Sequence, residues 1–202
     1  MTIEQVQLSA AEWKRFWAYY NDEPHQQEAI EMLRQYINEV DPTLLCNGAS
    51  WIDKYRQKQE TESKLTPDKP FSFRVTEHIT YGELCNGQEA RRFTQQHQCD
   101  TASRLCQFAE KARAYFGGKP IIITSGHRPE PINSQVGGAP GSEHTFSVPD
   151  KGAIDFLLNG VSTYRLQEWC DDNWPYSVGF GAPKGFVHLG LRPDNLHRRW
   201  TY

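Results

Sequence analysis

Two short apolar stretches, "GAIDFLL" at residues 152–158 and "GFVHLGL" at residues 185–191, decide the fold of this chain. Both have the length and the apolar character of buried strands. One polar side chain interrupts each of them, Asp155 in the first and His188 in the second. An unpaired carboxylate or imidazole is costly among apolar neighbours, so each of these two groups needs a partner. In a strand, Gly190 shares a face with His188.

The segments before and between these strands add helices and one more strand. "DTASRLCQFAEKARAYFGG" (100–118) predicts a helix with Asp100 or Thr101 as its N-cap and two glycines as its stop. "KPIIITSG" (119–126) predicts a buried strand that ends in a turn. "STYRLQEWCDDNW" (162–174) predicts a helix between the two quoted strands.

The order of these elements indicates the fold class. Residues 129–150 are rich in proline and glycine and are expected to form a long loop. Strands and helices mix without a regular βαβ repeat, which excludes a doubly wound sheet. We therefore predict an α+β fold with a mostly antiparallel sheet flanked by helices.

A small helical N-terminal unit is expected to precede this fold. Residues 10–37 carry apolar side chains at spacings of three and four, which is typical of amphipathic helices. Residues 58–70 are polar, hold two prolines and show no apolar periodicity, as in a linker. The predicted domains are residues 1–65, a helical unit, and residues 66–202.

The composition excludes some classes of function. A net charge of −3 and a pI near 6.2 argue against a nucleic-acid partner, because binding phosphates needs a basic surface. The sequence contains no run of 18 apolar residues, so we expect no membrane span. The opening "MTIEQVQLSAAEWKRF" lacks the pattern of a signal peptide, so we expect no export by the usual N-terminal route. We expect a monomer.

The five cysteines show no CxxC pair and no zinc-ribbon spacing. Because an odd number cannot pair completely within one chain, we predict buried reduced thiols. One disulfide among Cys85, Cys99 and Cys106 is the alternative.

Three polar residues have the composition of a metal site. A catalytic zinc ion usually takes three protein ligands of imidazole nitrogen and carboxylate oxygen, and leaves a fourth position for water. His144, Asp155 and His188 supply that number, and a metal ion would satisfy the buried Asp155 and His188 together.

The motifs around these residues resemble those of a known family. "ITSGHRP…INSQVGGAPGSEH…GAIDF…VGFGAPKGFVHLGLRP…RRW" is similar to the zinc D-alanyl-D-alanine carboxypeptidases, which cleave peptidoglycan peptides. The resemblance covers about residues 71–202. It makes residues 66–202 the predicted zinc peptidase domain, and the helical unit of residues 1–65 is expected to bind the cell wall or to pack on that domain. It implies that His144, Asp155 and His188 bind one zinc ion per chain. It also implies that Arg128 reaches the substrate or the transition-state oxygen, a role that suits a guanidinium group.

Other residues of the same motifs receive roles beside these. Ser142 is expected to help bind substrate by orienting a ligand through a hydrogen bond. Trp200 is expected to pack on the sheet rather than to contact substrate.

The chain departs from the family pattern at two places. Ten residues separate His144 from Asp155 where the family has six, which leaves Asp150 as the alternative ligand. Related enzymes often place Glu, Asp or His two or three residues before the last zinc ligand, and this chain has Gly185 and Phe186 there.

A proton donor for the leaving amine must then come from elsewhere. Glu143 and His127 are the candidates nearest in the sequence, and both belong to the predicted catalytic set with Arg128.

The resemblance implies a zinc metallopeptidase, a carboxypeptidase or endopeptidase that acts on peptidoglycan stem peptides in the lysis or remodelling of cell walls. Without a signal peptide, such an enzyme would be made in the cytoplasm. It would reach the wall as a phage endolysin does or by a non-standard export route. The alternative function is a catalytically inactive zinc-fold module that binds the cell wall or a protein partner.

Overall fold

The computed structural model describes residues 64–194 and 196–202. The chain divides into two units between Lys64 and Leu65. The predicted helices of residues 10–37 lie outside the described residues, and so does one of the five cysteines, Cys46. The division into domains at residues 65 and 66 stays a prediction.

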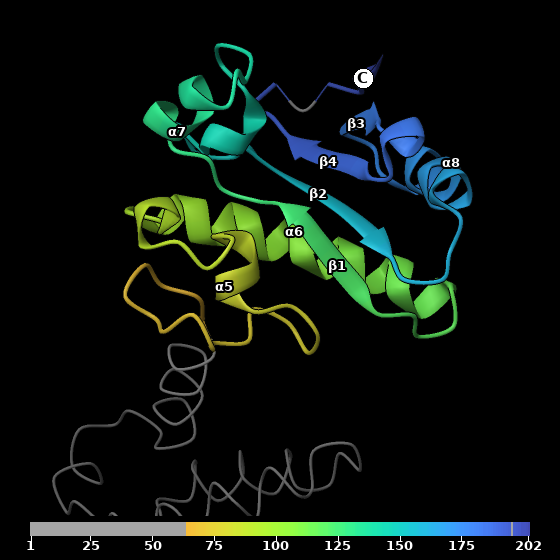
Figure 1. Ribbon diagram of the computed structural model, residues 1–202, viewed down its shortest axis with the longest axis horizontal. Helices are drawn as coiled ribbons and strands as arrows, with labels where there is room; N and C mark the ends of the chain where they lie inside the picture. Colours follow the sequence, from red (N-terminus) through yellow and green to blue (C-terminus); the bar gives the residue numbers. More distant parts are fainter. Residues whose placement is uncertain (1–63, 195) are drawn as a thin grey trace, which may run out of the picture. The chain divides into compact units, whose positions relative to one another are not determined.

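A five-stranded sheet lies at the centre of the described fold (Figure 1). Across the sheet the strands are β1 (Ile121–Ser125), β2 (Gly152–Leu158), β4 (Val187–Leu191), β3 (Ser177–Phe180) and β5 (Arg199–Thr201). All neighbouring pairs are antiparallel except β3 and β5, which run parallel. The predicted α+β class and the mostly antiparallel sheet are therefore confirmed.

Four α-helices accompany the sheet in the described residues: α5 (Tyr81–Leu84), α6 (Gln96–Tyr115), α7 (Glu130–Gln135) and α8 (Thr163–Asn173). Figure 1 shows α6 running alongside β1 and β2, and both α6 and α8 contact the sheet. Three short 3₁₀ turns complete the fold, of which η4 (Glu143–Thr145) matters most for the site.

The alternation of side chains along β2 and β4 gives the sheet two different faces. One face of β2 and β4 is apolar and belongs to the core that it shares with α6 and α8. Its side chains on these two strands are Ile154, Phe156, Leu158, Val187, Leu189 and Leu191. Asp155 and His188 are directly opposite each other in the β2–β4 register, on the other face.

Helix α6 begins earlier than expected. It starts at Gln96, not after an N-cap at Asp100 or Thr101. The side-chain oxygen of Gln98 accepts hydrogen bonds from the backbone N–H groups of Thr94 and Gln95, at 2.8 and 3.0 Å. These bonds satisfy donors that the start of a helix leaves open, so the first turn forms ahead of Asp100. The predicted stop is correct: α6 ends at Tyr115, before the two glycines.

The segment 129–150 was expected to be a long loop, but it contains α7 and η4. Pro131 lies in the first turn of α7, where a missing N–H costs nothing because that donor has no partner within the helix. Pro131, one of the prolines that suggested a loop, therefore lies at the start of a helix.

The thiols follow the sequence prediction. Cys85, Cys99, Cys106 and Cys170 are buried, and no disulfide joins these four. Among the described helices, none combines the length and the apolar character that crossing a membrane requires.

Candidate metal centre

The structure brings together the three residues that the sequence predicted as metal ligands. His144 lies in η4, Asp155 in β2 and His188 in β4. All three are buried, and each offers a ligand atom within 4.8 Å of those of the other two. The group could therefore hold a metal ion.

The second aspartate, Asp150, lies apart from this group. Its side chain is exposed, and its carboxylate forms an ion pair with Arg104 at 2.5 Å. The longer spacing from His144 is taken up by residues 147–151, so that β2 still places Asp155 opposite His188. Asp155 is the carboxylate that lies with the two histidines.

His144 presents a nitrogen that lacks a hydrogen-bond partner. Its Nδ1 lies 2.8 Å from the carbonyl oxygen of Gly126. A carbonyl only accepts, so Nδ1 carries the proton and the neutral ring keeps a lone pair on Nε2. That Nε2 is buried, makes no hydrogen bond, and lies 3.2 Å from Oδ2 of Asp155. Two acceptors facing each other at this distance suit a cation between them.

His188 lies between two carboxylates. Its Nδ1 is 2.7 Å from Oδ1 of Asp155, and its Nε2 is 2.8 Å from Oε2 of Glu143. The hydroxyl of Tyr202 lies 3.1 Å from the same Nδ1. Burial opposes a charged ring, but the two carboxylates prevail and raise the pKa of His188 to about 9.

The other groups of the site have pKa shifts with clear causes. Burial lowers the pKa of His144, against the opposing charge of Asp155. Burial would raise the pKa of Asp155, but the two histidines lower it, so this carboxylate is ionised. The site thus offers a neutral imidazole and an ionised carboxylate. Nitrogen and oxygen donors of this kind are those that zinc takes at catalytic sites.

Glu143 is almost fully buried, with 3% of its surface exposed. Its Oε1 accepts a hydrogen bond from Nε of Arg192 at 2.5 Å, while Oε2 contacts His188. Burial would raise its pKa, but His188 and Arg192 lower it. Both carboxylate oxygens therefore have a cationic or hydrogen-bonding partner.

Two members of this candidate group, His144 and His188, line a cleft of about 970 Å³. Arg128 lines this cleft, its backbone N–H donates to the carbonyl of His144, and its Nε is buried without a hydrogen-bond partner. Ser142 also lines it and caps η4, since its hydroxyl oxygen accepts from the backbone N–H of His144 at 3.3 Å.

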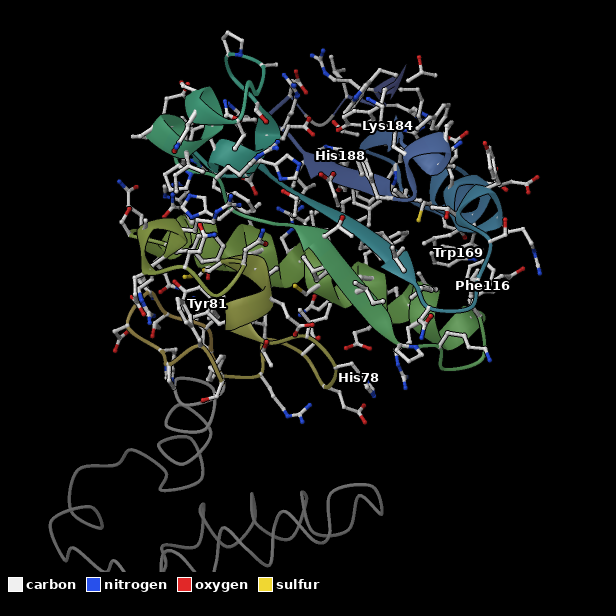
Figure 2. All side chains as sticks on the ribbon, in the orientation of Figure 1. His78, Tyr81, Phe116, Trp169, Lys184 and His188 are labelled. Atoms are coloured by element: carbon white, nitrogen blue, oxygen red, sulfur yellow. The ribbon has the colours of Figure 1, made fainter. Side chains whose placement is uncertain are left out.

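The cleft is more basic than the chain as a whole. Its lining includes one carboxylate, Glu143. The basic side chains that line it are Arg128, Lys184, Arg192, Arg198 and Arg199. Arg192, Arg198 and Arg199 form ion pairs with Glu143, Asp194 and Asp171, so within the described residues the excess positive charge of the cleft lies on Arg128 and Lys184. In Figure 2, His188 and Lys184 lie above Tyr81 and His78.

The structure places His127 away from the cleft. Its Nδ1 is 2.6 Å from the carbonyl oxygen of Arg91, and its ring packs against Phe93 and Phe146 at centroid distances of 4.8 and 5.5 Å. Burial lowers the pKa of His127 to about 4. His127 is not among the residues that line the cleft.

Four neighbours of the site, Arg192, Gly190, Trp200 and Tyr202, were not assigned to it from the sequence. Continuing the two-residue period of β4 would have placed Arg192 on the same side as His188 and Gly190. Trp200, expected to pack on the sheet, also lines the cleft, with its ring centroid 5.0 Å from that of His188. Local sequence carries no signal for Tyr202, because β5 reaches the site only by pairing with β3.

Comparison with known proteins agrees with this geometry. A family model described as peptidase M15 matches residues 77–190, which include His144, Asp155 and His188. Peptidases of this family use zinc. No curated protein matches the chain. The match covers more than half of the sequence, so this chain belongs to the peptidase M15 family.

Proposed function

We propose that this chain is a zinc peptidase that hydrolyses peptide bonds of peptidoglycan. The observation that carries the proposal is the buried Nε2 of His144, which faces Asp155 without a hydrogen bond beside His188. Such a nitrogen would be costly if it stayed unpaired, and it suits a metal ligand. Membership of the M15 family supports zinc as the metal and a peptide bond as the target.

One zinc ion per chain would be held by Nε2 of His144, a carboxylate oxygen of Asp155 and Nδ1 of His188. When bound, zinc polarises a substrate carbonyl and lowers the pKa of a water molecule toward 7. Three protein ligands leave the coordination position that this chemistry needs. The residues around the centre must then hold the substrate and manage its charges.

The basic cleft supports a substrate that carries carboxylates. Peptidoglycan stem peptides have this character, at their side chains and their C-terminus. Arg128 borders the cleft with an unpartnered Nε, and its guanidinium can form paired hydrogen bonds with a carboxylate or a developing oxyanion. The hydroxyl of Tyr202, close to Nδ1 of His188, can donate a further hydrogen bond to the substrate.

The proton for the leaving amine has two sequence-predicted sources, Glu143 and His127. Glu143 lines the cleft and His127 does not, which favours Glu143 by position. The carboxylate oxygens of Glu143 are engaged by His188 and Arg192, so proton delivery would require one of these contacts to open.

The proposal is tested on purified cell walls. The zinc-loaded protein should reduce the turbidity of a wall suspension, a chelator should abolish this effect, and added zinc should restore it. The matched control is Asp155→Asn, which removes the ligand charge and keeps the side-chain shape. Mass spectrometry of the released fragments identifies the bond and separates a carboxypeptidase from an endopeptidase. Intact walls and intact stem peptides after incubation with zinc-loaded protein would refute the proposal.

A second function, a wall-binding module without catalysis, is supported by one observation. Gly185 and Phe186 stand where related enzymes often carry an acid or histidine ahead of the last ligand. For this function, the protein would sediment with the walls while their turbidity and fragments stay unchanged. Release from the cell by a phage-type or non-standard route is part of the proposal for the enzyme, and no part of the described fold bears on it.

A further inference from the structure

We infer that Glu143 is a positioning residue: its carboxylate, seated in the space that Gly190 leaves and held by Arg192, fixes the ring of His188 for metal binding. The inference rests on the proposed zinc centre and adds residues that act on the metal ion through one of its ligands.

The first step is the arrangement of the two carboxylate oxygens. Oε2 of Glu143 lies 2.8 Å from Nε2 of His188, and Oε1 lies 2.5 Å from Nε of Arg192. The Glu143 side chain is 2% exposed and that of Arg192 is 36% exposed, so the contact with His188 is shielded from water while the arginine reaches the cleft. Arg192 thus supplies a counter-charge that lets the buried carboxylate stay ionised.

The second step is the space beneath this carboxylate. A Cβ atom on Gly190 would lie 1.8 Å from Oε2 and 2.6 Å from Cδ of Glu143. No side chain larger than that of glycine fits at position 190 while Glu143 keeps its place. Glu143 comes from η4 and Gly190 from β4, so this space exists only because the two segments meet.

The third step is the proton on His188. Both ring nitrogens of His188 face a carboxylate oxygen, and an ionised carboxylate only accepts. A metal ion bound at Nδ1 would therefore leave the ring proton on Nε2, which donates it to Glu143. Nδ1 then carries the lone pair when the ring is neutral, and Nδ1 is the nitrogen that faces Asp155 at 2.7 Å. A carboxylate on the remote nitrogen of a ligand histidine fixes the ring orientation and makes the other nitrogen a better donor.

The two ligand histidines are therefore oriented by different means. The neutral carbonyl of Gly126 holds Nδ1 of His144, whereas the charged carboxylate of Glu143 holds Nε2 of His188. Of these two groups, only the Glu143 carboxylate can be removed by changing a side chain. Substitution of Glu143 therefore tests the inference directly.

The experiment measures zinc affinity by competition with a chromogenic chelator at constant pH, without substrate. Glu143→Ala should weaken zinc binding by about 10- to 100-fold, the range typical for loss of such a partner. Glu143→Gln keeps an acceptor oxygen and should lose less. The matched control is Glu130→Gln, which removes an exposed carboxylate of α7 and should bind zinc like the wild type. The thermal midpoint of each metal-free variant identifies any that fails to fold.

A second arm tests the space at Gly190. Gly190→Ala keeps the Glu143 carboxylate but displaces it, so zinc affinity should fall by a similar factor. The double variant Gly190→Ala/Glu143→Ala should bind zinc only slightly more weakly than Glu143→Ala. The displaced carboxylate is already gone, and the new Cβ, 3.1 Å from Nε2 of His188, requires a shift of only a few tenths of an ångström. If Glu143→Ala does not fold, the comparison of Gly190→Ala with Glu143→Gln still tests the contact.

The opposing result is equally clear. If Glu143 delivers the proton to the leaving amine, Glu143→Gln will lower kcat on stem peptides while its zinc affinity stays at the wild-type value. That pattern, or additive effects in the double variant, would overturn the inference and leave the proposed peptidase standing. A wild-type chain with no measurable zinc affinity would instead refute the proposed function, and the inference with it.

Discussion

Strands β2 and β4 point alternate residues to opposite faces of the sheet, and the two faces differ in the kind of side chain that they carry. The core face carries large apolar side chains such as Phe156 and Leu189, packed among α6 and α8. The opposite face carries Asp155 and His188, with glycine at position 190. One face is defined by volume and the other by the placement of a few polar atoms.

The glycines show the difference most directly. On the site face, Gly190 leaves room for the Glu143 carboxylate, and a Cβ on Gly179 would lie 2.6 Å from the Tyr202 ring and 2.9 Å from the Trp200 ring. Because these two glycines carry no side chain, side chains from other segments lie over the sheet at these positions. A core face fills such space with its own side chains, because each buried methylene group adds stability. Substitutions on the two faces should therefore have separable effects on metal binding and on unfolding.

The largest expected effect is on the site face. Asp155→Ala removes one of three metal ligands, and we expect zinc affinity to fall by about 1,000-fold or more, which is about 4 kcal/mol. Elemental analysis after dialysis against dilute chelator measures the metal that each protein retains. Full zinc content in Asp155→Ala would assign the ligand role to another group.

Phe156→Ala tests the neighbouring residue, which points to the core face. Loss of this fully buried ring should lower the free energy of unfolding by about 3–5 kcal/mol. Chemical denaturation of the metal-free protein measures the change. Phe156→Leu is the milder variant for measuring zinc affinity, which we expect to remain at the wild-type value. A loss of zinc affinity in folded Phe156→Leu would mean that the two faces are not separable.

Arg128→Lys tests a residue at the border of the site. Lysine keeps the charge but loses the planar fork, so kcat/KM on stem peptides should fall by about 10- to 100-fold, as for loss of one charged hydrogen bond. Zinc affinity and the thermal midpoint should barely change, because the Nε of Arg128 has no hydrogen-bond partner within the described fold. A fall in thermal midpoint that matches the fall in activity would assign Arg128 a structural role.

The smallest expected effect is on the free energy of unfolding, and it concerns Glu110 on α6, outside both faces of the sheet. Glu110 accepts hydrogen bonds from the hydroxyl of Thr76 and the backbone N–H of His78, at 2.7 and 2.9 Å. Burial would raise the pKa of Glu110, but these bonds lower it below the ordinary 4.5. A carboxyl group whose pKa is lower in the folded state than in the unfolded chain stabilises the fold at pH values above its unfolded pKa. This stability is lost as the pH falls through its folded pKa.

Glu110→Gln should therefore cost about 1 kcal/mol at pH 7. The difference from the wild type should shrink as the pH drops below about 4.5, where the native carboxyl also becomes neutral. Urea unfolding at neutral and acidic pH measures both values. An equal cost at both pH values would show that shape, not charge, holds this contact, and zinc affinity should stay unchanged throughout.

The sequence by itself determined the strands of the site and its three candidate ligands. Alternation with a period of two residues is a local property, and so is the cost of a lone Asp155 or His188 among apolar neighbours. The length and apolar character of residues 152–158 and 185–191 predicted β2 and β4, and the irregular order of strands and helices predicted the α+β fold. The motifs that resemble zinc peptidases added His144, which no periodicity marks.

The tertiary structure alone decided which groups meet. Register places Asp155 opposite His188, whereas Asp150 pairs with Arg104 on the surface. The meeting of η4 with β4 puts Glu143 over Gly190, and the pairing of β5 with β3 brings Tyr202 to His188. These contacts join residues that are far apart in the sequence. The sequence pattern is local, so it can say that a buried polar group needs a partner, and only the folded chain determines which partner lies within reach.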